Sequence, residues 1–280
     1  MRLMLKLLRY FNRELKIIGI IGSIRLLLSR LISLLFIFKK KNIYYSVNNK
    51  IFESLRIDRK KTEIIYKKLS EQLDIDNWKH STNLNNTNDG SIHHLIFCGL
   101  KSLDFKPTNI LEIGTYTAES TEFLSNLFPE SSIYSVDLPE NDPIYKKYFD
   151  VKIQDYLNER LEKIKKLNNV KLIEVNTAFL MEQNLPKMDL IWNDGDMFYP
   201  DIAWENSYLY SLLEDGGYLL NDDVHLEENK ITLYNKKYLN IIETQRYIEK
   251  RIKSNFSYFY KNENYYQNAF YSKRISILKK

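Results

Sequence analysis

The residues best placed for chemistry are acids at the ends of apolar runs. Glu112 lies in the run NILEI, just before Gly114, and Asp137 ends the later run SIYSV. A carboxylate has two acceptor oxygens, so one that lies at the end of a strand can bind both neighbouring hydroxyls of a ribose. Asp137 therefore predicts a site for an adenosine-containing cofactor.

The segment from 109 to 137 predicts the elements that position these two acids. NILEI and SIYSV read as buried strands, a turn follows Gly114, and an amphipathic stretch then runs to Phe128. Strand, glycine turn, helix and strand in this order form the first half of a nucleotide-binding α/β sheet.

The turn GTYTAES distinguishes between two adenosine cofactors. NAD carries a pyrophosphate, which requires glycines where the backbone approaches it and an open helix N-terminus. Thr115, Tyr116 and Thr117 would crowd such a phosphate. S-adenosyl-L-methionine has no phosphate and needs only one glycine, so the turn favours it over NAD. A turn with a purely structural role is the alternative.

A second group of acids follows two later apolar runs. Asp194 follows DLIW, while Asp222 and Asp223 follow YLLN. If these runs are parallel neighbouring strands, the three carboxylates meet at one edge of the sheet. Carboxylates brought together repel unless protons or a cation compensate, and oxygen ligands select Mg²⁺, Mn²⁺ or Ca²⁺ rather than zinc. Capping of the following helices is the alternative.

The motif LEIGTYTAES resembles the first motif of the class I methyltransferases. It is similar to the version L-E-I-G-x-x-x-G-x-S of the catechol and caffeoyl-CoA type O-methyltransferases, with Ala118 where that group usually has glycine. The resemblance covers roughly residues 90 to 280. It implies a Rossmann-like α/β fold with a seven-stranded, mostly parallel sheet and an antiparallel last strand.

The same resemblance implies a cation site and leaves the catalytic base open. In these enzymes an Asp after the fourth strand and an Asp-Asn pair after the fifth hold a divalent ion, which matches Asp194, Asp222 and Asp223. A substrate hydroxyl bound to that ion would lose its proton more easily. Met197 stands where the family has Lys or His and cannot accept a proton. His225 is therefore the candidate base, and a loop histidine is the alternative.

A third predicted strand, VKLIEV, is followed by Asn176 and Thr177, which could contact the adenine edge or cap the next turn. NFSYFYK and AFYSKRISIL predict a β-hairpin with a long Tyr-rich loop. The residues expected to contact the cofactor lie in or after the predicted strands: Glu112, Gly114, Thr115, Tyr116, Asp137, Asn176, Thr177 and Asp194.

The charge of the chain is unevenly distributed. Of the net charge of +5, residues 1 to 41 contribute +9, so the remainder carries −4. A mildly acidic body is a poor partner for nucleic acid, which requires a clustered basic face. The single cysteine, Cys98, lies in the apolar run HHLIFCGL and is interpreted as a buried small side chain. It excludes a disulfide framework and is compatible with the cytoplasm.

Residues 1 to 41 predict a basic amphipathic helical arm, residues 42 to 90 a helical cap and linker, and residues 91 to 280 the methyltransferase domain. In the arm, Lys16, Arg25 and Arg30 interrupt the apolar stretches, so neither a transmembrane helix nor a cleavable signal peptide is expected. We interpret the arm as a peripheral contact with an anionic inner membrane face. Packing on the body or on a second subunit of a homo-oligomer is the alternative.

The leading hypothesis is a methyltransferase that transfers a methyl group from S-adenosylmethionine to a hydroxyl of a small molecule or glycan, with help from Mg²⁺ or Mn²⁺. Met197 leaves room for a non-catalytic protein that binds the same cofactor. A metal-dependent hydroxylase, similar to the cephalosporin hydroxylases, is a further alternative. The lack of a pattern of two histidines and one carboxylate argues against it.

Overall fold

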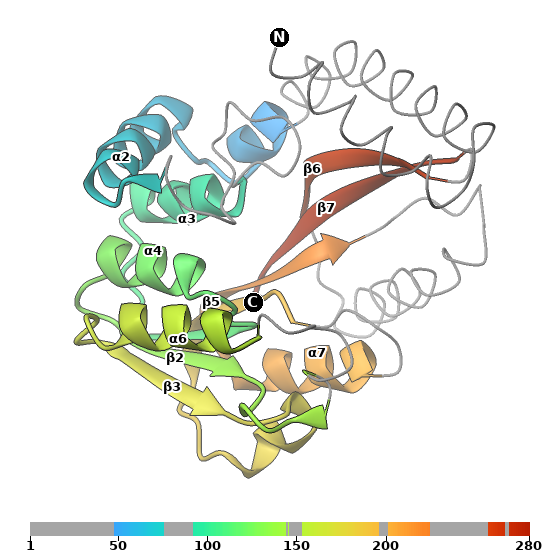
Figure 1. Ribbon diagram of the computed structural model, residues 1–280. Helices are drawn as coiled ribbons and strands as arrows, with labels where there is room; N and C mark the ends of the chain where they lie inside the picture. The colour runs from blue at the N-terminus through green and yellow to red at the C-terminus, as the bar shows by residue number, and fades with distance from the viewer. Residues whose placement is uncertain are drawn as a thin grey trace, which may run out of the picture.

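The computed structural model describes residues 48–75, 92–143, 145, 153–195, 201–224, 257–266 and 269–280 (Figure 1). The predicted arm, Met197 and His225 lie outside the described residues. Among those residues, no helix combines the length and the apolar character needed to cross a bilayer.

The described residues form one seven-stranded sheet with the order β3-β2-β1-β4-β5-β7-β6. The strands are β1 (Asn109–Ile113), β2 (Ser132–Asp137), β3 (Val170–Glu174), β4 (Met188–Asn193), β5 (Leu213–Val224), β6 (Ser257–Tyr266) and β7 (Ala269–Lys279). Strands β1 to β5 are parallel, and β7 pairs antiparallel with both β5 and β6. The predicted Rossmann-like, mostly parallel sheet with an antiparallel last strand is confirmed.

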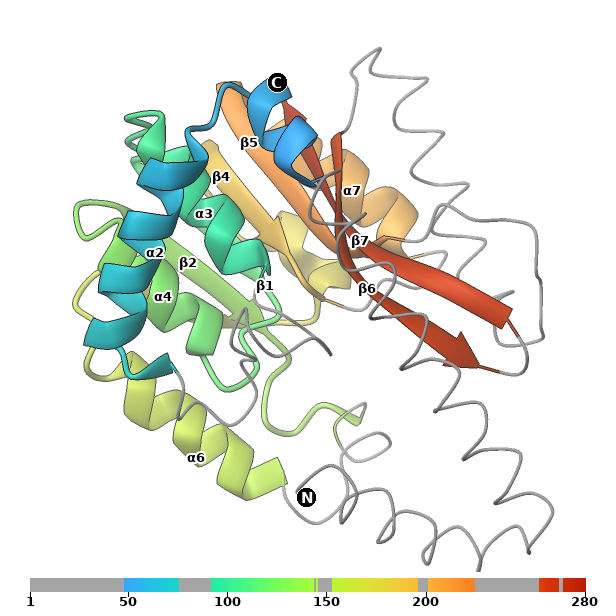
Figure 2. The same cartoon turned by 90° about the horizontal axis from the view of Figure 1, so that it is seen from above.

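Helices cover both faces of this sheet (Figures 1 and 2). They are α2 (Arg59–Gln72), α3 (Ile92–Ser102), α4 (Glu119–Leu127), α6 (Ile153–Ile164) and α7 (Asp201–Leu212), with a short 3₁₀ helix, η2 (Thr177–Glu182). One core cluster joins α2, α3 and α4 to the sheet, and the other joins α7 and η2 to the opposite face. Cys98 is fully buried in α3, where burial raises the pKa of its thiol.

The pleat of β4 explains why three large apolar residues, Leu190, Ile191 and Trp192, follow one another in its sequence. Leu190 and Trp192 belong to the core cluster on the α3 side, while Ile191 belongs to the cluster on the α7 side. Because both faces of a parallel sheet are covered, successive side chains are all buried.

The carboxyl ends of β1 to β5 share one edge of the sheet because these strands are parallel. The strand order reverses between β1 and β4, and open α/β sheets bind ligands at such a point.

Two element boundaries differ from the sequence prediction. Strand β5 begins at Leu213, five residues before the predicted run YLLN, and hydrogen bonds of 3.1 and 3.0 Å join residues 216–217 to Lys280. The predicted Tyr-rich loop is wrong, since β6 continues to Tyr266 and pairs with β7 along its length. The cross-strand pairing of this hairpin outweighs the local turn composition.

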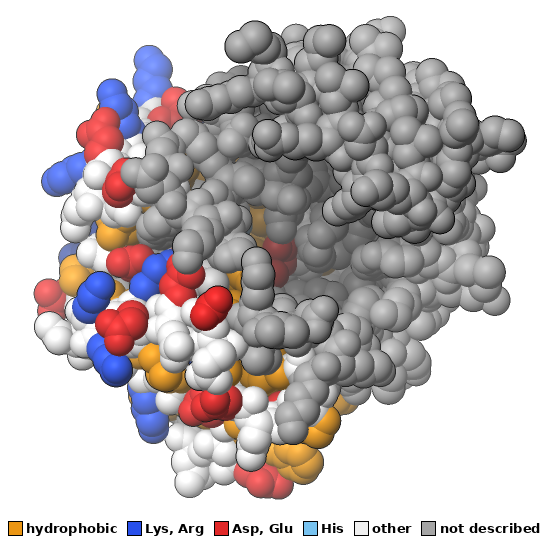
Figure 3. Space-filling view, in the orientation of Figure 1, with side chains coloured by type: hydrophobic (Ala, Val, Ile, Leu, Met, Phe, Trp, Pro, Cys, Tyr) orange, Lys and Arg blue, Asp and Glu red, His pale blue; other side chains and the backbone are white. Residues whose placement is uncertain are grey.

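Charged side chains on the face shown in Figure 3 are mixed in sign over the described elements. Lysines and arginines of α2 and α6 alternate with acids in i,i+4 pairs such as Arg59 with Glu63 and Lys163 with Glu159. Such a mixed surface agrees with the mildly acidic charge of the body.

Candidate cofactor site

The turn after β1 contacts the turn after β4 so closely that only glycine fits at position 114. Gly114 has φ +91°, and a Cβ added there would lie 2.5 Å from the backbone oxygen of Asp194. Two backbone hydrogen bonds hold this contact: Gly114 N donates to Val136 O at 2.8 Å, and Asp194 N donates to Ile113 O at 2.9 Å. Gly114 therefore joins the ends of β1, β2 and β4 at one point of the carboxyl edge.

The backbone of the rest of the turn is strained at two positions, and at one of them the related motif has glycine. Ala118 has φ +59°, and Tyr116 has φ +49°. Glycine adopts such angles without cost, whereas another residue there costs roughly 1–2 kcal/mol. The glycine that the related motif has at position 118 thus has a conformational reason, and alanine is the smallest replacement.

Glu112 is completely buried beneath the turn, and only one of its two carboxylate oxygens accepts hydrogen bonds. Its Oε2 accepts hydrogen bonds from Thr121 Oγ1 at 2.5 Å and Ser135 Oγ at 2.6 Å, while its Oε1 has no partner among the described residues. Burial raises the pKa of Glu112 to about 7; the two hydroxyls act in the opposite direction, and the charge of Asp137 adds to the rise. A buried acceptor without a donor is costly and fits an ammonium group of a ligand.

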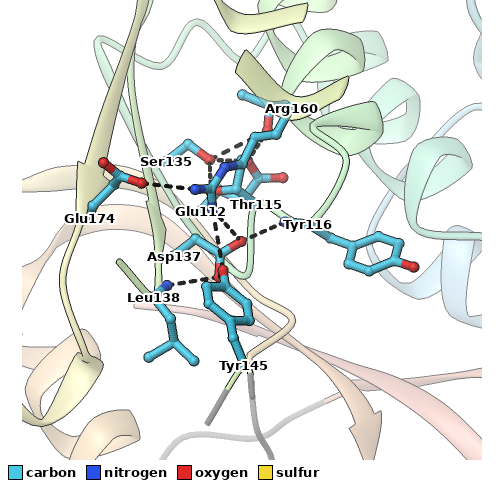
Figure 4. Close-up of polar contacts among 10 residues, drawn as sticks. Glu112, Thr115, Tyr116, Ser135, Asp137, Leu138, Tyr145, Arg160 and Glu174 are labelled. Atoms are coloured by element: carbon cyan, nitrogen blue, oxygen red, sulfur yellow. Dashed lines mark hydrogen bonds and ion pairs between the residues drawn. The ribbon is translucent and has the colours of Figure 1, made fainter. Parts of the chain in front are cut away.

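Asp137 lies at the end of β2 and accepts four hydrogen bonds or ion-pair contacts (Figure 4). Oδ2 receives Tyr116 N at 2.8 Å and the Arg160 Nη1 at 3.2 Å. Oδ1 receives Leu138 N at 2.8 Å and the Tyr145 hydroxyl at 2.7 Å. Asp137 thus accepts two hydrogen bonds at Oδ1, which use both lone pairs of that oxygen, and one at Oδ2, beside which the Arg160 guanidinium lies as an ion-pair partner.

The side chain of Arg160 forms an ion pair with Asp137 and so fixes the orientation of its carboxylate. Its guanidinium, on α6, is 1% exposed and also binds Glu174 Oε1 at the end of β3 at 2.8 Å. The guanidinium thus links the ends of β2 and β3, as Figure 4 shows. Sequence analysis missed Arg160 because an arginine in an amphipathic helix is typical of a solvent-exposed face.

Three tyrosines surround this carboxylate. The ring of Tyr116, which is 38% exposed, packs on Tyr156 with centroids 4.4 Å apart, and Tyr156 lies 6.3 Å from Tyr145. Burial, followed by the charge of Asp137, raises the pKa of both Tyr145 and Tyr156. Their hydroxyls therefore remain protonated donors at neutral pH.

The residues predicted to contact adenine adopt the capping arrangement. Asn176 Oδ1 accepts a hydrogen bond from Ala178 N at 3.0 Å and caps η2, which begins at Thr177. The cap uses the amide oxygen and leaves the amide nitrogen for another partner. An adenine contact by these two residues remains a prediction.

The predicted cation ligands are not seen as a cluster. Asp194 is exposed after β4, and Asp222 is 2% exposed in β5. The side chain of Asp223 lies outside the described ones, and the described part of the chain contains no group of three His, Cys, Asp or Glu side chains that could hold a metal ion. The cation site remains a prediction.

A buried polar network lies directly beneath these aspartates and was missed by sequence analysis. Asn193 Nδ2 donates to Glu205 Oε1 at 2.9 Å and to Asn221 Oδ1 at 3.2 Å, and Asn221 Nδ2 donates to Ser276 Oγ at 3.3 Å. The network ties the ends of β4, β5 and β7 to α7. The only sequence signal was an Asn at the end of each of two apolar runs.

The fold, unlike the sequence, is similar to that of known proteins. No family model matches the sequence, and no curated protein is similar to it at a significant level. The structure is similar to a candidate O-methyltransferase of Klebsiella pneumoniae, with a TM-score of 0.51 and 12% identity over 84% of this chain and 97% of the other.

Two further solved structures show the same similarity. A candidate caffeoyl-CoA O-methyltransferase of Staphylococcus aureus has a TM-score of 0.50 and 15% identity, covering 77% of this chain and 92% of its own. An O-methyltransferase of Bacillus cereus, solved in complex with SAH, has a TM-score of 0.50 and 13% identity, covering 84% and 97%. The chain therefore has the fold of the class I S-adenosylmethionine-dependent methyltransferases.

Proposed function

We propose that this protein is an S-adenosylmethionine-dependent methyltransferase that acts on a hydroxyl of a small molecule or glycan. The observation that carries the proposal is Glu112 Oε1, a buried acceptor without a donor beside the Gly114 turn of a methyltransferase fold. The α-ammonium of the cofactor is the donor that this oxygen lacks. Asp137, at the end of the neighbouring strand β2, is the group suited to the ribose.

In this proposal the cofactor supplies the electrophilic methyl group, and the chain orients it. Glu112 would hold the ammonium, Asp137 the ribose, and the backbone near Gly114, Thr115 and Tyr116 the carboxylate end. Positioning the methyl group in line with the acceptor oxygen converts binding energy into rate. Asn176 and Thr177 would border the adenine.

A divalent cation would lie between the ends of β4 and β5. Asn193 and Asn221 are paired in register, so Asp194 and Asp222, which follow them, are neighbours along the edge. With Asp223 they would hold Mg²⁺ or Mn²⁺, which favours ionisation of an acceptor hydroxyl. His225 would then accept the proton.

Calorimetry of the full chain with S-adenosylmethionine and SAH, with and without a chelator, tests the proposal. We expect Asp137→Ala to weaken cofactor binding at least about tenfold, because hydrogen bonds to a charged group are lost. Asp215→Ala is the matched control. Asp215 is 96% exposed and lies near the start of β5, at the opposite end of this strand from the proposed site. An affinity for the cofactor that Asp137→Ala leaves unchanged would refute the ribose assignment. Cofactor binding without a methylated product from any hydroxylated acceptor would favour the non-catalytic alternative.

The raised pKa of Glu112 predicts a pH dependence of cofactor binding. The ammonium group binds the ionised carboxylate, so protonation of Glu112 competes with binding below its pKa of about 7. We expect the association constant to rise by about fivefold between pH 6 and pH 7.5, because ionisation of Glu112 increases binding while the cofactor α-amino group loses only part of its protonation. Titration calorimetry at four pH values measures this rise. In Glu112→Gln the rise should vanish, and a flat profile in the unaltered protein contradicts the assignment.

The basic arm, residues 1 to 41, would place the enzyme on an anionic membrane surface at the cytoplasmic side. Support comes from its net charge of +9 in an apolar context. Sedimentation with anionic liposomes compares the full chain with one that begins at residue 42. Equal pelleting of the two forms excludes the membrane role.

A further inference from the structure

The acceptor capacity of Asp137 is already used within the protein. Its four partners are Tyr116 N, Leu138 N, Arg160 Nη1 and the Tyr145 hydroxyl. A ribose hydroxyl can bind Oδ1 only when one of its two donors leaves, because both lone pairs of that oxygen are used, and Oδ2 lies against the guanidinium. The question is which donor is exchangeable.

Three of the four donors are held in place by other constraints. The two amide groups belong to the backbone of the Gly114 turn and of the residue after β2, so their removal would require a change of the turn itself. Arg160 is 1% exposed and has a second ion pair with Glu174 at 2.8 Å. Withdrawing the guanidinium would leave a largely buried carboxylate without its cation, which is strongly unfavourable.

The Tyr145 hydroxyl is the fourth donor, and it is chemically equivalent to a ribose hydroxyl. Its oxygen donates to Asp137 Oδ1 at 2.7 Å and accepts from Arg160 Nη1 at 3.3 Å. A ribose hydroxyl can make the same two hydrogen bonds, one as donor and one as acceptor. Exchange of one hydroxyl for the other therefore leaves both Asp137 and Arg160 satisfied.

We propose that the Tyr145 hydroxyl occupies the position of one ribose hydroxyl in the cofactor-free protein and that the cofactor must displace it. This inference rests on the proposed function. Tyr145 is then an internal competitor that lowers cofactor affinity. Its aromatic ring, 2% exposed and packed against Tyr156, adds to the competition because it becomes exposed when it leaves.

The test is the affinity of Tyr145→Phe for S-adenosylmethionine and SAH, measured by calorimetry on the full chain. The substitution keeps the ring and removes only the competing hydroxyl. We expect the dissociation constant to fall by about tenfold, since a hydrogen bond to a charged group no longer has to be broken. Tyr156→Phe is the matched control: its ring belongs to the same aromatic cluster, but its hydroxyl is not among the partners of Asp137, so the affinity should stay within about twofold.

Each outcome decides the inference. Equal or weaker binding by Tyr145→Phe overturns it, while the proposed function survives if the unaltered protein binds. Absence of binding by both forms refutes the proposed function together with the inference. Binding by Tyr145→Phe alone supports both.

A second measurement uses the sugar instead of relying on the tyrosine variant alone. In the unaltered protein, the hydrogen bonds that adenosine gains over 2′,3′-dideoxyadenosine are partly offset by the loss of the one from Tyr145. In Tyr145→Phe the difference between the two nucleosides should widen about tenfold. A difference that is equal in both proteins overturns the displacement.

Discussion

Gly114→Ala is expected to lower the free energy of unfolding by about 3 kcal/mol or more and to abolish cofactor binding. Two costs add at this position. An alanine at φ +91° is strained, and its Cβ would lie 2.5 Å from Asp194 O and 2.9 Å from Asp194 C, which are backbone atoms that cannot rotate away. Relief of the clash would push the turn after β1 away from the turn after β4, which separates the two halves of the proposed site.

The fold provides a matched control for the steric part of this effect. Gly216 has φ +87°, and a Cβ added there meets no atom within 4 Å. Gly216→Ala should therefore show the conformational cost alone, about 1 kcal/mol. Urea denaturation of both variants measures the difference, and cofactor titration of each shows whether only the first loses binding. Equal loss of stability in the two variants would show that the close approach to Asp194 has no energetic consequence.

Arg160→Met is the second substitution with a large expected effect. Arg160 is 1% exposed, and the side chain of Asp137 is 11% exposed, so methionine would leave a largely buried carboxylate with only neutral donors. Removal of one member of such a buried pair typically costs 3–5 kcal/mol, and the partial exposure of Asp137 places the expected loss near the lower value, about 3 kcal/mol. Urea denaturation at neutral pH measures it.

Two further variants separate the ion pair from simple packing. Glu174 is 44% exposed, so solvent screens its bond to Arg160, and Glu174→Gln should cost less than about 1 kcal/mol. When Asp137→Asn is combined with Arg160→Met, the loss should be smaller than the sum of the two single losses by at least about 1 kcal/mol. Additive losses would mean that the ion pair with Asp137 makes no contribution to the stabilisation by Arg160.

The parts of the fold that depend on local pattern could be predicted from the sequence. The strands β1, β2 and β4 are rich in apolar residues because both of their faces are covered, and this composition is visible without any knowledge of neighbours. The glycine at the end of β1 and the acid at the end of β2 also lie where the sequence placed them. These features are local consequences of the backbone and of burial.

The partners of each site residue were decided only by tertiary structure. Arg160 reaches Asp137 because α6 packs beside α4 at the ends of β2 and β3, and Tyr145 reaches the same carboxylate from the segment that follows β2. The sequence by itself predicted a mostly parallel sheet, which the structure confirms, and an adenosine-type site, which stays a prediction. Which donors fill Asp137, and that Glu112 keeps an unfilled oxygen, depend on how separate helices and strands pack together. A periodic pattern records that a residue is buried but not what it contacts, since each contact depends on the docking of elements distant in sequence.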